Sequence, residues 1–101
     1  MHLVQLLLPL YNNSGMQFEA NIYTEVRNEL VNRFGGITAY TRVPVHGLWQ
    51  ESKQIVRDDL VIYEIMVDTL EKVWWRKYRM NLENRFQQQA LVVRAYPILL
   101  L

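Results

Sequence analysis

Apolar positions divide the chain into segments with two different spacings. Four short runs are rich in apolar, β-branched and aromatic residues, which is typical of β-strands: His2–Leu8, Ile37–Val43, Leu60–Val67 and Ala90–Tyr96. Apolar residues recur every three to four positions in Phe18–Phe34 and again in the segment after Asp68, which indicates two amphipathic helices. Val45–Trp49 is predicted as a short additional strand and the polar segment Gln50–Arg57 as a hairpin tip.

Capping residues predict where the helices begin and end. Ser14 and Gln17 have the capping-box spacing, so the Ser14 hydroxyl is expected to accept the backbone N–H of Gln17. Gly35 is expected to end the first helix in the left-handed conformation. Asp68 or Thr69 is expected to cap the second helix.

The predicted order β-α-β-β-α-β indicates an α+β, ferredoxin-like fold with a four-stranded antiparallel sheet. Both helices are expected on one face of the sheet, and a small hairpin is inserted before the third major strand. The first and third major strands should lie in the centre of the sheet. With 101 residues, the chain is expected to form one domain over residues 1–101.

Alternation along the strands predicts two different faces of the sheet. One set is nearly all apolar and is expected under the helices: Val4, Leu6, Leu8, Ile37, Ala39, Val61, Tyr63, Ile65, Val67, Leu91, Val93 and Ala95. The opposite set, called the open face below, mixes apolar and polar residues: Leu3, Gln5, Leu7, Thr38, Tyr40, Arg42, Ile62, Glu64, Met66, Asp68, Val92, Arg94 and Tyr96. So large an apolar patch is unusual on a soluble monomer, which predicts a homodimer that packs sheet against sheet.

The polar residues of the open face are the candidates for chemistry. Gln5, Glu64 and Arg94 are predicted in mid-strand on the same side, with Gln5 between the other two. We expect a ligand site between the two sheets of the dimer, lined by Gln5, Tyr40, Arg42, Glu64, Met66, Arg94 and Tyr96. Arg94 or Arg42 would anchor a carboxylate, and Glu64 or His46 would be the weak candidates for proton transfer. The alternative is a polar network that fixes the register of a filled dimer interface.

Composition excludes several classes of function. Eleven basic and ten acidic residues give a formal charge of +1, which offers no general attraction to nucleic acid or acidic membranes. The absence of cysteine removes thiolate chemistry and Cys-based metal sites, and two histidines give no metal triad, so neither a metal nor a cofactor is predicted. The longest largely apolar run, Leu6–Tyr11, is shorter than a membrane helix, and no signal peptide is expected, so the predicted location is the cytoplasm.

Three short motifs carry a resemblance to a known group. Arg33-Phe34-Gly35-Gly36-Ile37-Thr38, then Gly47-Leu48-Trp49, then Asp58 and Asp59 resemble the F-G-G-x-T, G-x-W and acidic pattern of small uncharacterised bacterial proteins with a ferredoxin-like scaffold. The layout is also similar to the dimeric α/β-barrel superfamily, in which two such chains join sheet faces around a cavity. This resemblance implies no activity by itself.

The sequence therefore leaves two main functions open, with a partner-binding helix at Trp74 as a third possibility, and does not decide whether the chain is an enzyme. The first is a homodimer that binds or transforms a small anionic or aromatic molecule between its sheets. The second is a structural or protein-interaction module with a filled interface and no catalytic activity.

Overall fold

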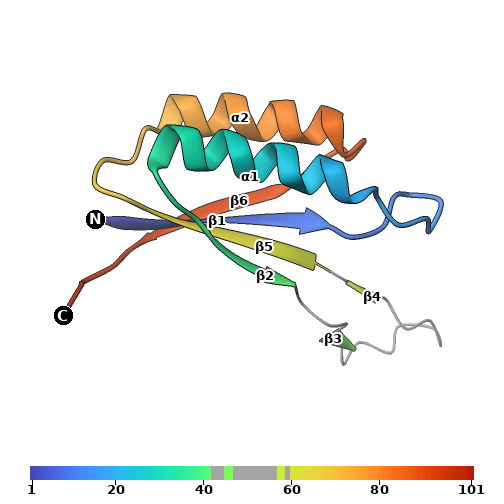
Figure 1. Cartoon of the computed structure of the whole chain (residues 1–101), viewed down its shortest axis with the longest axis horizontal. Coiled ribbons are helices and arrows are strands. Elements are labelled where there is room, and N and C mark those ends of the chain that lie inside the picture. The colour runs from blue at the N-terminus through green and yellow to red at the C-terminus, as the bar shows by residue number, and fades with distance from the viewer. Residues whose placement is uncertain (42–44, 47–56, 59) are drawn as a thin grey trace.

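A computed structural model describes residues 1–41, 45–46, 57–58 and 60–101. The elements are β1 (His2–Pro9), α1 (Ala20–Phe34), β2 (Thr38–Thr41), β3 (Val45–His46), β4 (Arg57–Asp58), β5 (Leu60–Val67), α2 (Lys72–Arg85) and β6 (Val92–Pro97). β3 and β4 pair with each other and form a separate two-stranded sheet, the inserted hairpin (Figure 1). The predicted order of elements is confirmed.

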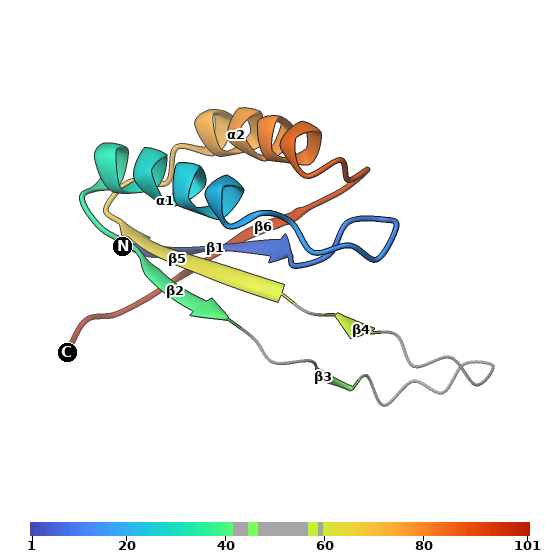
Figure 2. The same cartoon turned by 45° about the vertical axis from the view of Figure 1, so that its right-hand side comes forward.

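The four main strands form an antiparallel sheet in the order β2-β5-β1-β6. β1 and β5, the first and third major strands, occupy the centre as predicted. Both helices cover one face of this sheet, and Figures 1 and 2 show them on the same side from two directions. The fold is therefore the ferredoxin-like α+β arrangement that the sequence predicts.

The core lies between the helices and the covered face of the sheet. Its buried side chains come mainly from the two central strands and from the inner sides of the helices: Val4, Leu6, Leu8, Val26, Leu30, Val61, Tyr63, Ile65, Val67, Trp75, Leu82, Phe86 and Leu91. Two residues predicted under the helices, Ala39 and Ala95, are exposed because they lie on the edge strands β2 and β6. The alternation otherwise assigns the two faces correctly.

The tyrosine hydroxyls of the core find partners in the backbone. The Tyr63 hydroxyl donates to the carbonyl of Tyr23 at 3.0 Å, and the Tyr23 hydroxyl donates to the carbonyl of Pro9 at 2.6 Å. Burial raises the pKa of Tyr23 to about 12. These bonds connect α1 to both central strands and keep the hydroxyls satisfied away from water.

The first helix begins later than the sequence predicts, and Ser14 does not cap it. The Asn12 side chain accepts the backbone N–H groups of Ser14 and Met16, each at 2.9 Å, so this segment forms a tight turn of its own. The residue at the N-cap of α1 is Glu19, which makes no side-chain capping bond. The capping-box prediction is wrong because the Asn12 side chain organises the turn around Ser14 instead.

The second helix also begins without the predicted cap. Its N-cap residue is Glu71, again without a side-chain capping bond, so the prediction for Asp68 or Thr69 is wrong. The Glu71 carboxylate instead accepts from Arg33 Nη2 at 2.7 Å. At the end of α1, Gly35 adopts the left-handed conformation with φ 86°, as predicted.

Candidate functional site

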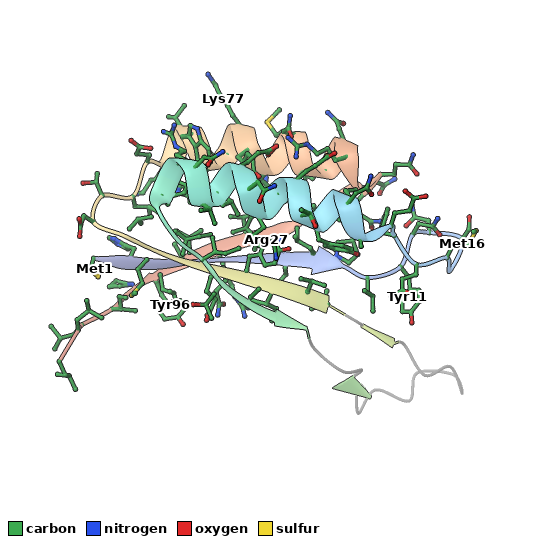
Figure 3. All side chains as sticks on the ribbon, in the orientation of Figure 1. Met1, Tyr11, Met16, Arg27, Lys77 and Tyr96 are labelled. Carbon is green, nitrogen blue, oxygen red and sulfur yellow. The ribbon has the colours of Figure 1, made fainter. Side chains whose placement is uncertain are left out.

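The open face of the sheet lies opposite both helices. Leu3, Leu7 and Ile62 are half-buried there, whereas three apolar or aromatic side chains nearer its ends and edge are exposed: Met66, Val92 and Tyr96. Figure 3 shows Tyr96 on the side of the sheet away from the helices, while Lys77 of α2 points in the opposite direction. Within the described part of the chain, the apolar patch that the sequence predicts is therefore in contact with water.

A chain of polar side chains crosses the middle of this face. In the ladder, Gln5 of β1 pairs with Glu64 of β5 on one side and with Arg94 of β6 on the other. Gln5 Nε2 donates to Glu64 Oε2 at 2.5 Å, and Arg94 Nε donates to Gln5 Oε1 at 2.8 Å. The Gln5 amide thus bridges Glu64 and Arg94, which lie on the two strands that flank β1. Its NH2 group faces the carboxylate and its oxygen faces the guanidinium.

This chain leaves hydrogen-bonding groups free at both ends. Among the described residues, Arg94 uses only its Nε, so both Nη groups remain available to an anion. Glu64 uses one carboxylate oxygen, so its second oxygen remains an acceptor. The arrangement therefore presents donors and an acceptor, held at fixed positions by Gln5, on an otherwise apolar surface.

A recess of about 560 Å³ lies beside Glu64, at the end of the sheet where α1 turns into β2. Its walls come from the open face and from this turn, and its lining residues are Leu3, Phe34, Gly35, Gly36, Ile37, Thr38, Glu64 and Met66. A Cβ added at Gly35 or Gly36 would meet nothing within 4 Å, so the turn leaves this space open. We call this space the Glu64 recess.

The remaining predicted site residues fall into three groups. Tyr96 pairs with Leu3 and lies on the open face two residues beyond Arg94. Tyr40 lies in β2 opposite Ile62. His46 lies in β3, outside the four-stranded sheet, and Arg42 lies outside the described residues. The structure thus brings Gln5, Glu64 and Arg94 into direct contact and adds Met66 in the same recess as Glu64.

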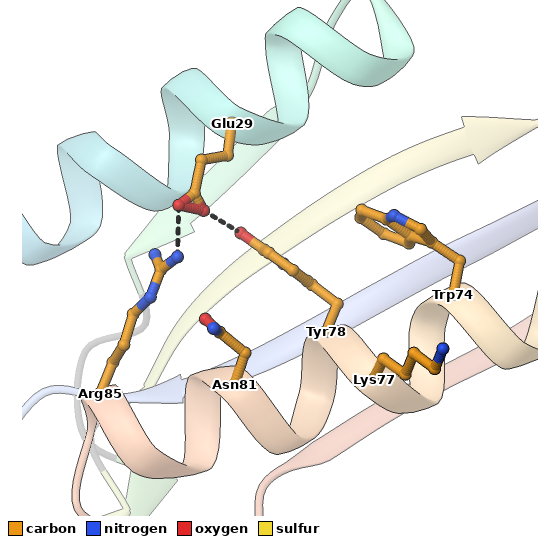
Figure 4. A pocket seen from close by; sticks show the side chains of 6 residues that line it. All are labelled: Glu29, Trp74, Lys77, Tyr78, Asn81 and Arg85. Atoms are coloured by element: carbon orange, nitrogen blue, oxygen red, sulfur yellow. Dashed lines mark hydrogen bonds and ion pairs between the residues drawn. The ribbon is translucent and has the colours of Figure 1, made fainter.

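A second open pocket, of about 420 Å³, lies between the two helices on the outer surface (Figure 4). It is lined by Glu29, Trp74, Lys77, Tyr78, Asn81 and Arg85. The Glu29 carboxylate accepts from the Tyr78 hydroxyl at 3.0 Å and from the Arg85 guanidinium. Burial and this hydrogen bond raise the pKa of Tyr78 above its ordinary value, and the bond to Glu29 raises the pKa of Arg85. Because Glu29 is already paired with both residues, we interpret the cluster as a tie between the helices.

Two features of these sites are absent from the sequence prediction. Glu29, a charged residue of α1, pairs with Tyr78 and Arg85 of α2, and no pattern in the sequence analysis indicates this pairing. The part played by Gly36 and Thr38 in the Glu64 recess is also not predicted. The sequence does hold a signal for their position. Gly36 follows Gly35, the glycine that ends the helix, and Thr38 begins the strand in which it pairs with Glu64. Among the described residues, no three acidic or histidine side chains gather in a way that could hold a metal ion.

These observations define the class of protein as a single-chain ferredoxin-like α+β fold with an uncovered sheet face. A solved structure with a similar fold is that of a phage SAM lyase in complex with S-methyl-5'-thioadenosine. The TM-score is 0.57 at 15% sequence identity, and the match covers 94% of this chain and 79% of that one. At this identity the likeness shows the fold alone.

No family model matches the chain, and no curated protein matches it either. The resemblance of residues 33–64 to small bacterial proteins therefore stays a prediction. Neither helix among the described residues is long and apolar enough to cross a membrane.

Proposed function

We propose that this protein forms a homodimer through its open face and binds a small organic molecule between the two sheets. The observation that carries the proposal is the hydrogen-bonded chain Glu64–Gln5–Arg94 in the middle of an uncovered apolar surface. An apolar patch of this kind is stable in water mainly when something covers it. A second copy offers the same polar groups in reversed order across the interface, since a two-fold interface is self-complementary.

The proposed ligand has an aromatic part and a second part that is either an anion or a strong hydrogen-bond acceptor. The free Nη groups of Arg94 suit the anionic or accepting part, and Tyr96, Met66 and Leu3 suit an aromatic ring. The similarly folded phage SAM lyase holds S-methyl-5'-thioadenosine, so adenine nucleosides belong among the first molecules to test. The proposal covers binding, and no reaction step is part of it.

Ligand binding can be tested by thermal shift with S-methyl-5'-thioadenosine, adenosine and aromatic carboxylates as probes. A ligand at about 100 times its Kd should stabilise the folded protein by about 2.7 kcal/mol, which is roughly 10 to 20 °C in Tm for a domain of this size. Arg94→Ala should abolish the shift because it removes the proposed anchor. Lys77→Ala, which removes a cation on the helix side, is the matched control and should leave the shift unchanged.

The alternative is a module whose interface is filled and holds no ligand. It is favoured by the fact that Gln5 already bonds to both Glu64 and Arg94, which links the three side chains without a ligand. If no probe shifts the Tm while Glu64→Ala still weakens the dimer, this alternative is the better account. Binding that survives Arg94→Ala unchanged would contradict the proposed site.

A further inference from the structure

The segment after β6 is apolar and stands apart from the folded body. The backbone N–H of Ile98 donates to the carbonyl of Met1 at 3.1 Å, and Ile98 is half-buried. The next three side chains are largely free: Leu99 is 83% exposed, Leu100 60% and Leu101 115%. Figures 1 and 2 both show the segment running past the end of the sheet, on the side away from the helices. Three consecutive exposed leucines on that side need a partner surface.

The Glu64 recess lies at the same end of the sheet as this segment. Pro97, the last residue of β6, pairs with His2, and Tyr96 pairs with Leu3, which lines the recess. Leu3 also pairs with Met66, a second lining residue. Apolar side chains thus form part of the wall, beside the polar groups of Glu64 and Thr38, and the recess lies at the end of the sheet where Leu99–Leu101 leave it. Within the described residues the segment is apolar and exposed, and no side chain fills the recess.

We infer that residues 98–101 of each copy close the Glu64 recess of the partner copy, an inference that rests on the proposed dimer. Two sheets can face each other about a two-fold axis parallel to β1. Such an axis keeps the same ends of the sheets together and exchanges their edges. Because the sheet order is β2-β5-β1-β6, the partner's β6 then lies on the side of β2, near the recess.

The length of the segment fits this placement. Stacked sheets lie about 10 Å apart. Three residues beyond Ile98 span at most about 10 to 11 Å when extended. The segment is therefore long enough to cross from one sheet to the other and to place leucine side chains over the recess. The partner then completes the site, since Glu64 would be enclosed by residues of both copies.

The size of the sheet face also favours added contact from these segments. Three strand spacings of about 4.8 Å and eight residues of about 3.3 Å give a flat face of roughly 14 by 26 Å. A stable interface commonly buries about 800 Å² on each partner, which is large for such a face. Two apolar segments, one from each copy, enlarge the interface at its ends.

The chain contains no cysteine, so introduced cysteines report the placement without interference. One copy carries Thr38→Cys and the other carries Leu100→Cys, both at exposed positions, and the two copies have different tags. The copies are mixed and equilibrated in a glutathione buffer. A disulfide needs Cα atoms within about 7 Å, so we expect a covalent dimer with one copy of each tag. Val73→Cys on α2, paired with Leu100→Cys, is the control and should give little or none.

The other results separate this inference from the proposed function. A single chain carrying both Thr38→Cys and Leu100→Cys tests whether the segment folds onto its own recess. An intrachain bond there, with no bond between copies, overturns the inference. A dimer by light scattering that gives no more cross-link than the control also overturns it and leaves the proposed dimer standing. A monomer by light scattering contradicts both. Equal cross-linking of Leu100→Cys to Thr38→Cys and to Val73→Cys would mean that the segment has no fixed position on the partner, which overturns the inference.

Discussion

Gly35 ends α1 with a φ of 86°, and its backbone N–H donates to the carbonyl of Val31 at 2.7 Å. This conformation is rare for residues with a Cβ, because the Cβ then approaches the following carbonyl oxygen. Gly36 is next in the chain and does not have such a φ, although a Cβ there would also meet open space. The two glycines therefore serve as a matched pair, in which only the first depends on lacking a side chain.

We expect Gly35→Ala to lower the free energy of unfolding by about 1 to 2 kcal/mol, the cost of a left-handed non-glycine residue. Gly36→Ala should change it by less than about 0.5 kcal/mol. Urea denaturation of both variants measures the difference. Equal effects would show that the left-handed turn is not what the first glycine provides.

At the residue scale, the polar chain and the glycine that ends α1 could be predicted, but the N-caps of the two helices could not. Gln5, Glu64 and Arg94 each sit in the middle of a strand, so alternation and strand order bring them together. Ser14 and Gln17 have the spacing of a capping box, so the sequence predicts this cap as clearly as it predicts the polar chain. The cap fails because the Asn12 side chain bonds two backbone N–H groups of the same turn, and such local competition leaves no trace in apolar periodicity.

The two helices are tied together by Glu29, Tyr78 and Arg85, and this tie depends on protonation. The Tyr78 hydroxyl donates to the Glu29 carboxylate, and burial followed by this bond raises the pKa of Tyr78. The folded protein therefore holds the proton at a pH where the unfolded chain begins to lose it. The contribution to stability is fully present below the ordinary tyrosine pKa of 10.0 and is lost as pH rises through the raised folded value.

Tyr78→Phe should reduce the free energy of unfolding by about 1 to 2 kcal/mol at pH 7, since a hydrogen bond to a charged acceptor is lost. The difference between the variant and the parent should shrink above pH 10. Chemical denaturation at a series of pH values measures this. Tyr11→Phe, which alters an exposed ring, is the control and should have little effect at pH 7. A difference that grows with pH would contradict the assignment.

At the element scale, strands were easier to predict than helix starts. β5 matches its predicted bounds because seven apolar or aromatic residues, interrupted only by Glu64, lie between polar segments. The first residues of α1 and α2 depend on turns and ion pairs, such as Glu71 with Arg33, that join distant parts of the chain. The pairing of Glu29 with α2 is likewise tertiary, so the spacing within α1 does not reveal it.

The molecule has two layers, one of helices and one formed by the sheet. Within the described residues, no third layer covers the open face. Its helices bury one side of the sheet, and the other side has apolar residues that water meets in the single chain. Covering each of these side chains is worth on the order of 1.5 to 3 kcal/mol. The fold could be predicted from the sequence because the two faces differ in composition. What covers the open face depends on another molecule, so its geometry does not follow from the order of elements.

Met66 and Met80 allow this idea to be tested with equal side chains. Met66 on the open face is 56% exposed, and Met80 on α2 is 57% exposed. Met66→Lys should place a charge in the proposed interface and weaken the dimer at least tenfold, because a buried unpaired charge is costly. Met80→Lys should not. Light scattering over a concentration series gives the mass, expected as twice 12.1 kDa for the parent and 12.1 kDa for Met66→Lys at low concentration. A parent that stays at 12.1 kDa, or a trimer, would contradict the two-fold pairing.

The central position of β1 has a consequence for how the protein is made. Among the strands of this sheet β1 is synthesised first, yet its two neighbours, β5 and β6, are the last two to be synthesised. β1 therefore lacks its backbone partners until β5 and β6 have been synthesised. During that time its leucine-rich sequence is unpaired and open to aggregation.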